Sequence, residues 1–376
     1  MPAVLTLNAG SSSLKAEVFG PGGARLWRGA VSEIGAAARL SSDEDDAPVA
    51  APDHAAALSA VMTAAGVRLD GIEAAAHRIV HGGPGLTEST RLTPAVRAAV
   101  EAAAALAPLH NPPALAVIDA LSALRPALPQ VACFDTAFHA TMPELARRYA
   151  LPDRPETAGL RRYGFHGLSY ASLVADLAGR LGRPLPRRLL ACHLGNGASL
   201  CAIDGGRSVA TTMGYSPLGG LTMGTRCGDI DGNAVLEIAA RSDIATASRI
   251  LNRESGLRGL AGDSDMRALE AAGTPAADFA MRHFIYWAVR QAGAMVAAMG
   301  GCDAIAFTGG IGENAPAIRA GIMDGLAYLG LAYDPGANAA GAMRLDRAGS
   351  ALIACIHPAD EEGWIAREAA AVLSPG

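Results

Sequence analysis

Residues 4–19 read Val4-Leu5-Thr6-Leu7-Asn8-Ala9-Gly10-Ser11-Ser12-Ser13-Leu14-Lys15-Ala16-Glu17-Val18-Phe19. A buried strand, a turn of small polar residues and a second strand are predicted by this order of apolar and polar residues. The same order recurs at residues 189–204, LLACHLGNGASLCAID, where Ser199-Leu200-Cys201-Ala202 matches Ser13-Leu14-Lys15-Ala16. Two copies of one hairpin predict two similar halves of α/β type.

The rest of the chain alternates short apolar stretches with longer stretches rich in Ala and Leu, which is typical of an α/β protein. Strands are predicted at residues 3–7, 14–19, 26–31, 72–79, 130–135, 189–194, 199–204, 207–212, 303–308 and 351–356. Helices are predicted near 54–65, 94–106, 113–123, 167–181, 233–241, 276–299 and 316–326. Thr93 followed by Pro94 marks the clearest helix start, with Thr93 as the N-cap. The acidic segment 41–53 is predicted to be a solvated loop.

Composition excludes several classes of protein. A length of 376 residues favours two domains, and 51% hydrophobic with 18% charged residues argues against a disordered chain. The net charge of −5 gives no general attraction to nucleic acid or an anionic membrane. No apolar run approaches the roughly 20 residues of a membrane span, and the N-terminal stretch lacks a basic segment. We therefore expect a cytoplasmic protein with no nucleic-acid or membrane partner.

The six cysteines form no CxxC pair, so neither a zinc site nor a disulfide framework is predicted.

The turn between the first two strands has the composition of a phosphate-binding loop. Small residues let an anion approach the backbone, while the hydroxyls of Ser11 and Ser13 and the backbone amides can donate hydrogen bonds. Lys15 follows directly and is the one lysine among the 31 basic residues. A compact ammonium fits a tight phosphate pocket where a planar guanidinium does not. The alternative is an ordinary Ser/Gly hairpin with a stray surface lysine.

Two further Gly-rich turns follow predicted strands. His193-Leu194-Gly195-Asn196-Gly197 follows the strand at 189–194, and Gly309-Gly310-Ile311-Gly312-Glu313-Asn314 follows the strand at 303–308. Each is a weak signal for nucleotide binding by itself, since the spacing matches GxGxxG only in degraded form. Three such turns in one chain together favour a nucleotide-binding protein.

Several charged residues stand in apolar or Gly-rich surroundings. Arg78 and Arg226 lie next to glycine-containing turns, Asp135 ends the strand QVACF, and His166 lies between Phe165 and Gly167. Taken singly, each of these residues is more often structural than catalytic. Together, arginines, a histidine and a carboxylate beside phosphate loops are what phosphoryl transfer requires.

Eight motifs in order, NAGSSSLK, HRIVHGG, PLHNPPAL, FDTAFHATMP, RRYGFHGLSY, CHLGNGASL, SPLGGLTMGTRCGDID and FTGGIGEN, resemble the family of acetate and propionate kinases. The resemblance runs from Leu7 to about Glu362. It implies two similar actin-like (ribonuclease H-like) α/β domains, with ATP and substrate in the cleft between them. It also implies a homodimer, acetate or acetyl phosphate as substrate, ATP/ADP as the nucleotide, and Mg²⁺.

The resemblance also implies roles for individual residues. Catalysis is implied for Arg78, Asp135, His166 and Arg226, and metal binding for Asn8 and Glu361. The acyl group is expected against Arg78, Val80, Leu109, His110, Phe165 and Pro217. The nucleotide is expected against Ser11, Ser13, Lys15, His193, Leu194, Gly195, Asn196, Gly197, Asp265, Met266, Arg267, Gly310, Ile311, Gly312, Glu313 and Asn314.

The chain departs from the family pattern near its C-terminus, where Ala359-Asp360-Glu361-Glu362 replaces a typical Thr-Asn-Glu-Glu. This leaves open whether Glu361 or Glu362 is the metal position. The predicted domains are residues 1–137, with the helix 363–376 packing back onto them, and residues 138–362.

The expected reaction is the reversible transfer of the ATP γ-phosphoryl group to acetate. A carboxylate is already nucleophilic at neutral pH, so this chemistry needs no strong general base. Asp135 is therefore better interpreted as a residue that organises metal or geometry than as a proton acceptor. A propionate kinase is the nearest alternative, with acyl size set near Val80. An actin- or chaperone-like nucleotide switch would not need an acyl pocket with two arginines, and a dehydrogenase would need an intact GxGxxG after the first strand.

Overall fold

The computed structural model describes residues 2–374, so the ends of the predicted first domain and last helix, at Met1 and at 375–376, lie outside it. The chain divides into two units. Unit 1 contains Met1–Phe138, Gly167–Ser172 and Asp360–Gly376, and unit 2 contains His139–His166 and Leu173–Ala359. These bounds differ from the predicted domains at Phe138, 167–172 and 360–362, which all belong to unit 1. The reason is packing: Leu168 belongs to the same apolar cluster as the C-terminal helix.

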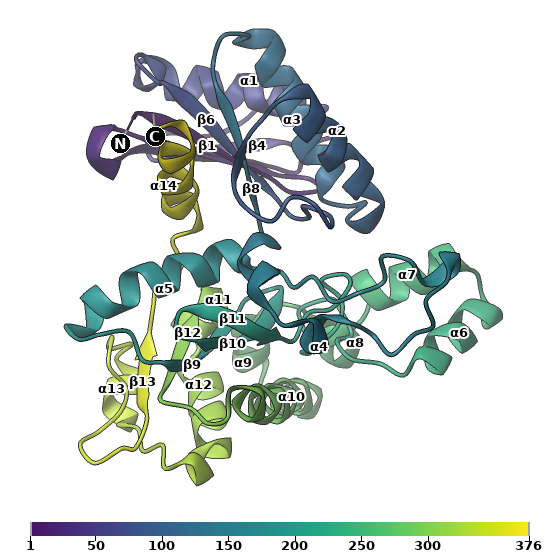
Figure 1. The fold of residues 1–376 in the computed structure, drawn as a ribbon, viewed down its shortest axis with the longest axis vertical. Helices are drawn as coiled ribbons and strands as arrows, with labels where there is room; N and C mark the ends of the chain where they lie inside the picture. Colours follow the sequence, from purple (N-terminus) through teal and green to yellow (C-terminus); the bar gives the residue numbers. More distant parts are fainter. Residues whose placement is uncertain (1, 375–376) are drawn as a thin grey trace. The chain divides into compact units, whose positions relative to one another are not determined.

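Unit 1 is built on an eight-stranded sheet with the order β5-β4-β3-β2-β1-β6-β8-β7. Its strands are β1 (Val4–Ala9), β2 (Leu14–Phe19), β3 (Arg25–Ser32), β4 (Arg39–Ser42), β5 (Asp46–Pro48), β6 (Ala74–Ile79), β7 (Thr90–Arg91) and β8 (Gln130–Phe134). Its helices are α1 (His54–Ala65), α2 (Pro94–Ala102), α3 (Asn111–Leu124) and α14 (Glu361–Leu373), and Figure 1 shows α14 against this sheet. The predicted loop at 41–53 was wrong in part, because β4 ends at Ser42 and β5 pairs with it.

Alternation along the strands of unit 1 gives its sheet two apolar faces. One face packs on α1 and α3 through a cluster that includes Leu5, Leu7, Leu14, Ala16, Ile79, Leu58 and Leu121. The other packs on α14 through a cluster that includes Val4, Ala74, Ala76, Cys133, Ile365 and Ala369. Because side chains alternate, Asn8 on β1, Lys15 on β2 and Arg78 on β6 lie on the α14 face. The two-residue alternation of the strands therefore places three predicted site residues on the face of the sheet that packs against α14.

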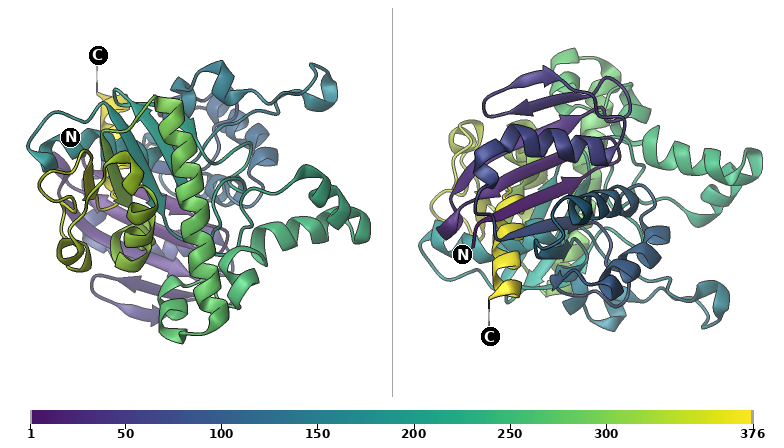
Figure 2. Two further views of the ribbon diagram at one scale, coloured as in Figure 1. Left: turned by 90° about the horizontal axis from the view of Figure 1, so that it is seen from below. Right: turned by 90° about the horizontal axis from the view of Figure 1, so that it is seen from above.

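Unit 2 is built on a five-stranded sheet with the order β11-β10-β9-β12-β13. Its strands are β9 (Arg188–Leu194), β10 (Ala198–Asp204), β11 (Arg207–Thr211), β12 (Ala304–Thr308) and β13 (Ile353–Ile356). Its helices are α4 (Glu144–Arg147), α6 (Gly232–Arg241), α7 (Ile244–Arg253), α8 (Gly256–Ala261), α9 (Met266–Ala272), α10 (Pro275–Met299), α11 (Gly309–Asn314), α12 (Pro316–Gly325) and α13 (Pro335–Ala339). Helix α5 (Gly167–Leu181) begins in unit 1 and continues in unit 2. Figure 2 shows the long helix α10 (bright green) running beside the strands of its sheet, with which it is in contact.

The two sheets repeat one topology. In unit 1, β1 pairs antiparallel with β2 and parallel with β6, while β2 continues to β3 and β6 to β8. In unit 2, β9 pairs antiparallel with β10 and parallel with β12, while β10 continues to β11 and β12 to β13. The two hairpins noticed in the sequence are therefore the corresponding hairpins of two similar sheets, which confirms the predicted duplication. In the described residues, no helix is long and apolar enough to cross a membrane.

Candidate active site

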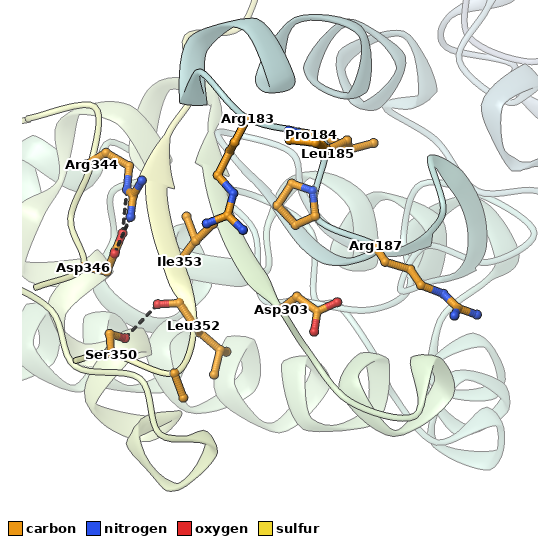
Figure 3. A pocket seen from close by; sticks show the side chains of 12 residues that line it. Arg183, Pro184, Leu185, Arg187, Asp303, Arg344, Asp346, Ser350, Leu352 and Ile353 are labelled. Atoms are coloured by element: carbon orange, nitrogen blue, oxygen red, sulfur yellow. Dashed lines mark hydrogen bonds and ion pairs between the residues drawn. The ribbon is translucent and has the colours of Figure 1, made fainter. Parts of the chain in front are cut away.

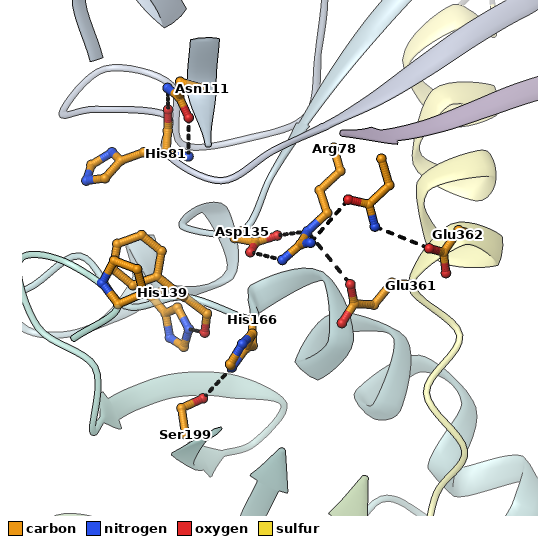
Figure 4. Close-up of polar contacts among 12 residues, drawn as sticks. Arg78, His81, Asn111, Asp135, His139, His166, Ser199, Glu361 and Glu362 are labelled. Carbon is orange, nitrogen blue, oxygen red and sulfur yellow. Dashed lines mark hydrogen bonds and ion pairs between the residues drawn. The ribbon is translucent and has the colours of Figure 1, made fainter. Parts of the chain in front are cut away.

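Arg78 and Asp135 form the centre of a polar cluster in unit 1. Arg78 lies near the end of β6, and Asp135 directly follows β8, the neighbouring parallel strand. The guanidinium donates two hydrogen bonds to the carboxylate, from Nε to Oδ1 at 2.9 Å and from Nη2 to Oδ2 at 2.6 Å. Figure 4 shows this forked contact, which holds the planar guanidinium in a fixed orientation.

Asn8, Glu361 and Glu362 complete the cluster. Arg78 Nη1 donates to Asn8 Oδ1 at 3.2 Å, and Asn8 Nδ2 donates to Glu362 Oε1 at 3.3 Å. Arg78 Nε lies 3.8 Å from Glu361 Oε2. The structure therefore brings together the predicted metal positions Asn8 and Glu361 with Asp135, and it also brings in Glu362.

Burial controls the protonation of this cluster. Burial raises the pKa of Glu361, with Asp135 and Glu362 adding to the effect and Arg78 opposing it. Burial also opposes the charge on Arg78, but the carboxylates of Asp135 and Glu361 outweigh it and keep its pKa above the ordinary value. Three carboxylates against one guanidinium leave an excess of negative charge.

The donor set fits Mg²⁺, which prefers oxygen ligands and is typically held by one or two carboxylates while keeping waters and substrate phosphates. Within residues 2–374, no group of three or more His, Cys, Asp and Glu side chains could hold a metal ion without other ligands. An amide oxygen from Asn8 and a carboxylate from Glu361 match the sparser coordination of Mg²⁺.

Lys15 lies on β2 opposite Asn8 in the antiparallel register, and its side chain is exposed. Its charge lowers the pKa of Glu361, which indicates that the ammonium lies near this cluster. The preceding turn is tight, since Gly10 N donates to Ser13 O at 2.8 Å. A Cβ at Gly10 would lie 2.6 Å from Ser13 Oγ, so a larger residue there would require the Ser13 hydroxyl to turn away.

Unit 2 holds a second cluster, built around His166. This residue caps α5 with a left-handed backbone, φ 59°, which is uncommon for a residue with a side chain. Its Nδ1 lies 2.9 Å from Ser199 Oγ, a contact drawn in Figure 4, and its ring stacks on that of His193 with centroids 4.1 Å apart. The imidazole ring is therefore held on one face by stacking and on one edge by the hydrogen bond at Nδ1.

Arg226 approaches the same place. Its Nη1 donates to Pro217 O at 3.0 Å. A Cβ built on Gly197 would lie 3.3 Å from Arg226 Nη1 and 3.4 Å from His166 Nε2. The glycine predicted from the motif thus leaves room for a predicted catalytic arginine and histidine to lie against one turn.

The three predicted nucleotide segments of unit 2 meet at a pocket of ≈ 530 Å³, whose lining does not include the predicted Ser11, Ser13 and Lys15 of unit 1. Its lining includes residues from each of the three segments, namely Gly195, Asn196, Asp265, Met266, Arg267, Gly310, Ile311 and Asn314. Sequence reasoning missed Ser264 and Ala315, although both adjoin predicted residues. Asp265 caps α9 and pairs with Arg267 at 2.9 Å, and hydrogen bonding from Arg267 lowers the pKa of Asp265.

Five of the predicted nucleotide residues of unit 2 are not part of this lining: His193, Leu194, Gly197, Gly312 and Glu313. Glu313 has a different environment, because its Oε1 accepts from Gly309 N at 3.0 Å and from Ala359 N at 2.9 Å. Leu194 and Gly312 are buried.

The predicted acyl-binding residues divide between the units. Val80, Leu109 and His110 belong to unit 1, whereas Phe165 and Pro217 belong to unit 2. Val80 and Phe165 are buried, and Leu109 is exposed. The acyl pocket and the cleft between the domains stay predictions.

A further pocket of ≈ 490 Å³ lies where β12 and β13 begin in unit 2, the opposite end of these strands from the nucleotide segments (Figure 3). It contains no predicted residue. Its charges are largely paired: Arg344 with Asp346 at 2.5 Å, and Asp303 with Arg188 at 2.6 Å. Nothing about it indicates phosphoryl chemistry.

Comparison with known proteins agrees with the motifs. Residues 3–367 match the model of the acetokinase family. The chain is 42% identical over 392 residues to an acetate kinase of Nitrobacter hamburgensis, covering 99% of this chain and 96% of that protein.

Two solved structures extend the likeness to the fold. A crystal structure of Porphyromonas gingivalis acetate kinase superposes with a TM-score of 0.90 at 35% identity, covering 100% of both chains. A propionate kinase from Francisella tularensis gives 0.92 at 33% identity, covering 98% of this chain and 99% of that one. These likenesses confirm the predicted two-domain α/β fold of the actin-like class. From its motifs, its duplicated sheets and its full-length likeness to these proteins, the chain belongs to the acetokinase family.

Proposed function

We propose that this chain is an ATP-dependent kinase that transfers the γ-phosphoryl group of ATP reversibly to acetate, giving acetyl phosphate and ADP. The observation that carries the proposal is the pocket lined by Gly195, Asp265 and Gly310, where three segments far apart in sequence meet. A nucleotide is the ligand that all three segments were predicted to bind. The family membership supports acetate as the acceptor.

The chemistry of the acceptor explains the arginines. Acetate is anionic, and so is the phosphoryl group that it attacks, so the reaction must bring two like charges together. In our proposal, Arg78 and Arg226 neutralise this repulsion and orient the acetate and the phosphoryl group. No residue has to remove a proton from acetate, because the carboxylate is already ionised at neutral pH.

Asp135 has the role of an organiser in this proposal. Its two contacts to the guanidinium of Arg78 fix the direction of that side chain, and the carboxylate is almost fully buried. His166 donates a hydrogen bond to the phosphoryl group, and its stacking on His193 limits rotation of the ring. Asn8 and Glu361 would hold Mg²⁺, which when bound neutralises charge on the phosphate oxygens.

Trapping the acyl phosphate tests the proposal directly. The chain is incubated with ATP, Mg²⁺ and hydroxylamine, and with acetate, propionate or butyrate in turn, and the acyl hydroxamate is measured. We expect the highest kcat/KM with acetate. Preference for propionate would assign the alternative acceptor, and ATP hydrolysis without any hydroxamate would favour a nucleotide switch instead.

We also propose that the enzyme is a cytoplasmic homodimer. Support comes from the helices α6 and α7, which Figure 2 shows extending from the rest of unit 2 (green, residues 232–253). Leu236 on α6 is 68% exposed and Ile244 on α7 is 83% exposed. Large apolar side chains on a projecting helix pair are typical of an interface between protein chains.

A further inference from the structure

Arg319, on α12, is an almost fully buried cation that the proposed chemistry does not use. Only 1% of Arg319 is exposed to solvent. Among residues 2–374 no carboxylate pairs with it, since its hydrogen bonds go to an amide side chain and to backbone carbonyls. Burying an unpaired charge is costly unless hydrogen bonds replace its water. The carbonyls that supply these bonds therefore indicate what the arginine does.

Four hydrogen bonds hold the guanidinium between two helices. Nε donates to Asn338 Oδ1 at 2.8 Å, and Nη2 donates to Asn338 O at 2.7 Å. Nη1 donates to Gly312 O at 3.0 Å and to Glu313 O at 2.8 Å. Asn338, on α13, is itself fixed by a bond from Nδ2 to Pro316 O at 2.8 Å. Arg319 thus ties α13 to the last carbonyls of α11.

Helix α11 needs such support. It has six residues, Gly309–Asn314, and begins with two glycines, which are among the weakest helix formers. A cation at the C-terminal carbonyls satisfies groups that have no partner within the helix and interacts favourably with its dipole. At the other end, the carboxylate of Glu313 accepts from Gly309 N. The same carboxylate accepts from Ala359 N, outside the helix, so α11 is tied to the rest of unit 2 through Glu313 as well as through Arg319.

The opposite side of α11 lines the nucleotide pocket through Gly310, Ile311 and Asn314. Arg319 and Asn338 are not part of that lining. A change at the Arg319 side chain would therefore reach a nucleotide by moving α11 or Ala315 at the start of α12.

We propose that Arg319, supported by Asn338, is a positioning residue that sets the shape of the nucleotide pocket by fixing α11. The inference rests on the proposed function, because it takes the pocket to be the site of ATP and ADP. Changes at Arg319 or Asn338 should therefore alter the affinity for the nucleotide and leave acetate binding unchanged, since neither residue contacts a group assigned to acetate.

The experiment compares Arg319→Lys and Asn338→Ala with the unchanged chain. Lysine keeps the charge but loses the fork that reaches Asn338 and the α11 carbonyls together. Asn338→Ala removes one acceptor of the guanidinium and the tie to Pro316, and is the milder change. ADP binding is measured by calorimetry, and the KM values for ATP and acetate are measured with kcat.

We expect the Kd for ADP and the KM for ATP to rise about tenfold or more in Arg319→Lys, and less in Asn338→Ala. The KM for acetate should stay within about twofold, and kcat at saturating ATP within about threefold. The matched control is Arg344→Met, which breaks the partly exposed ion pair with Asp346 in the same unit, away from the nucleotide pocket. It should lower thermal stability without changing the Kd for ADP.

Unchanged ADP affinity in folded Arg319→Lys would overturn the inference. If Arg319→Lys does not fold, Asn338→Ala decides alone: a raised Kd for ADP supports the positioning role, and an unchanged Kd with only a lower Tm overturns it. If the unchanged chain fails to bind ADP, the proposed nucleotide site itself falls, and the two failures are distinguishable.

Discussion

The forked contact between Arg78 and Asp135 makes these two residues act together. Asp135 holds the guanidinium that we propose to contact acetate and phosphoryl oxygens, so removing either partner disturbs the other. Arg226 donates from Nη1 to the carbonyl of Pro217.

Arg78→Ala and Arg226→Ala should each lower kcat/KM by about 10³-fold or more, because each removes charge stabilisation of the transferring group. Steady-state kinetics in the acetate direction measure this, with circular dichroism and a melting curve as the check on folding. Arg78→Ala should also lower Tm more than Arg226→Ala, since it leaves the buried Asp135 without its partner. A variant that keeps more than about a tenth of the activity does not fill the role assigned to it.

Lys15→Arg tests whether the one lysine of the chain contacts phosphate. The side chain is exposed, and its charge reaches Glu361, so an arginine there keeps the charge in place. We expect turnover to fall clearly nonetheless, because the wider guanidinium fits a tight hairpin site poorly, and we expect Tm to stay unchanged. Kinetics with ATP varied give the answer. Full activity in Lys15→Arg would leave the phosphate contacts to Ser11, Ser13 and the backbone.

Val80→Ala should shift acceptor preference towards propionate. Val80 is buried just after β6, and the smaller side chain would make room for one more methylene of the acyl group. At about 0.8 kcal/mol per buried CH₂, the ratio of kcat/KM for propionate over acetate should rise about fourfold. Hydroxamate formation with both acids measures the ratio. A ratio that stays constant or falls would remove Val80 from the acyl site.

At the scale of secondary-structure elements, strand β6 carries a charged arginine on one face and a buried histidine on the other. Arg78 faces α14, whereas the neighbouring His77 faces the core under α1 and α3, where its Nε2 lies 2.7 Å from Gln130 Oε1. Burial lowers the pKa of His77 to about 4, against the opposing effect of the hydrogen bond to Gln130. This interior strand of the sheet therefore contains a buried titratable histidine next to a catalytic candidate.

This makes the free energy of unfolding depend on pH. Between pH 6.5 and 4, the unfolded chain binds a proton at His77 that the folded chain does not, so stability should fall as the pH falls. The loss amounts to about 3 kcal/mol once the pH is below both pKa values. Urea unfolding at pH 7 and pH 4.5 measures most of this loss, with His77→Gln as the variant that lacks the titrating group. An equally steep pH dependence in His77→Gln would show that other groups cause it.

Elements with a strong local signal could be predicted from the sequence, and elements held by distant contacts could not. The strands of both sheet centres were predicted from their apolar runs, and Thr93 indeed caps α2 by accepting from Val96 N. The edge strands β5 and β7 have three and two residues and no apolar pattern to reveal them. Helix α11 was predicted only as a turn, because its glycines favour no helix and its stability depends on Arg319 and Glu313.

The same division applies to the candidate site. Arg78, Asp135 and the Gly-rich turns were visible in the sequence as charged residues in apolar surroundings and as turn motifs. The roles of Asn8, Glu361 and Asp265 to Arg267 were implied only by the resemblance to the family. Ser264 and Ala315 carried no signal, since a serine and an alanine line a pocket only through where the backbone lies. Glu313 was predicted to contact the nucleotide because it belongs to the motif GGIGEN. In the structure its carboxylate instead accepts hydrogen bonds from two backbone amides, those of Gly309 and Ala359.

For the molecule as a whole, the exposed apolar surface of α6 and α7 predicts a dimer. Leu236→Glu combined with Ile244→Glu should convert a dimer into a monomer, because each change places a charge in the proposed interface. Light scattering coupled to gel filtration measures the mass. Leu145→Glu on α4 is the control, since Leu145 is 97% exposed yet lies outside α6 and α7, and it should leave the mass unchanged. A monomeric unchanged chain would contradict the proposal.

A chain with a single lysine offers a chemical handle that few enzymes of this size possess. Amine-acylating reagents used at alkaline pH have Lys15 as their sole side-chain target, and the α-amino group, with its lower pKa, can be blocked first near neutrality. Lys15 is exposed on β2, so a reporter dye attaches there without unfolding the protein. One covalent label would then sit beside the Asn8 and Glu361 cluster at full stoichiometry. Protection of that amine by ATP, read as slower labelling, becomes an assay of nucleotide contact that requires no substitution at all.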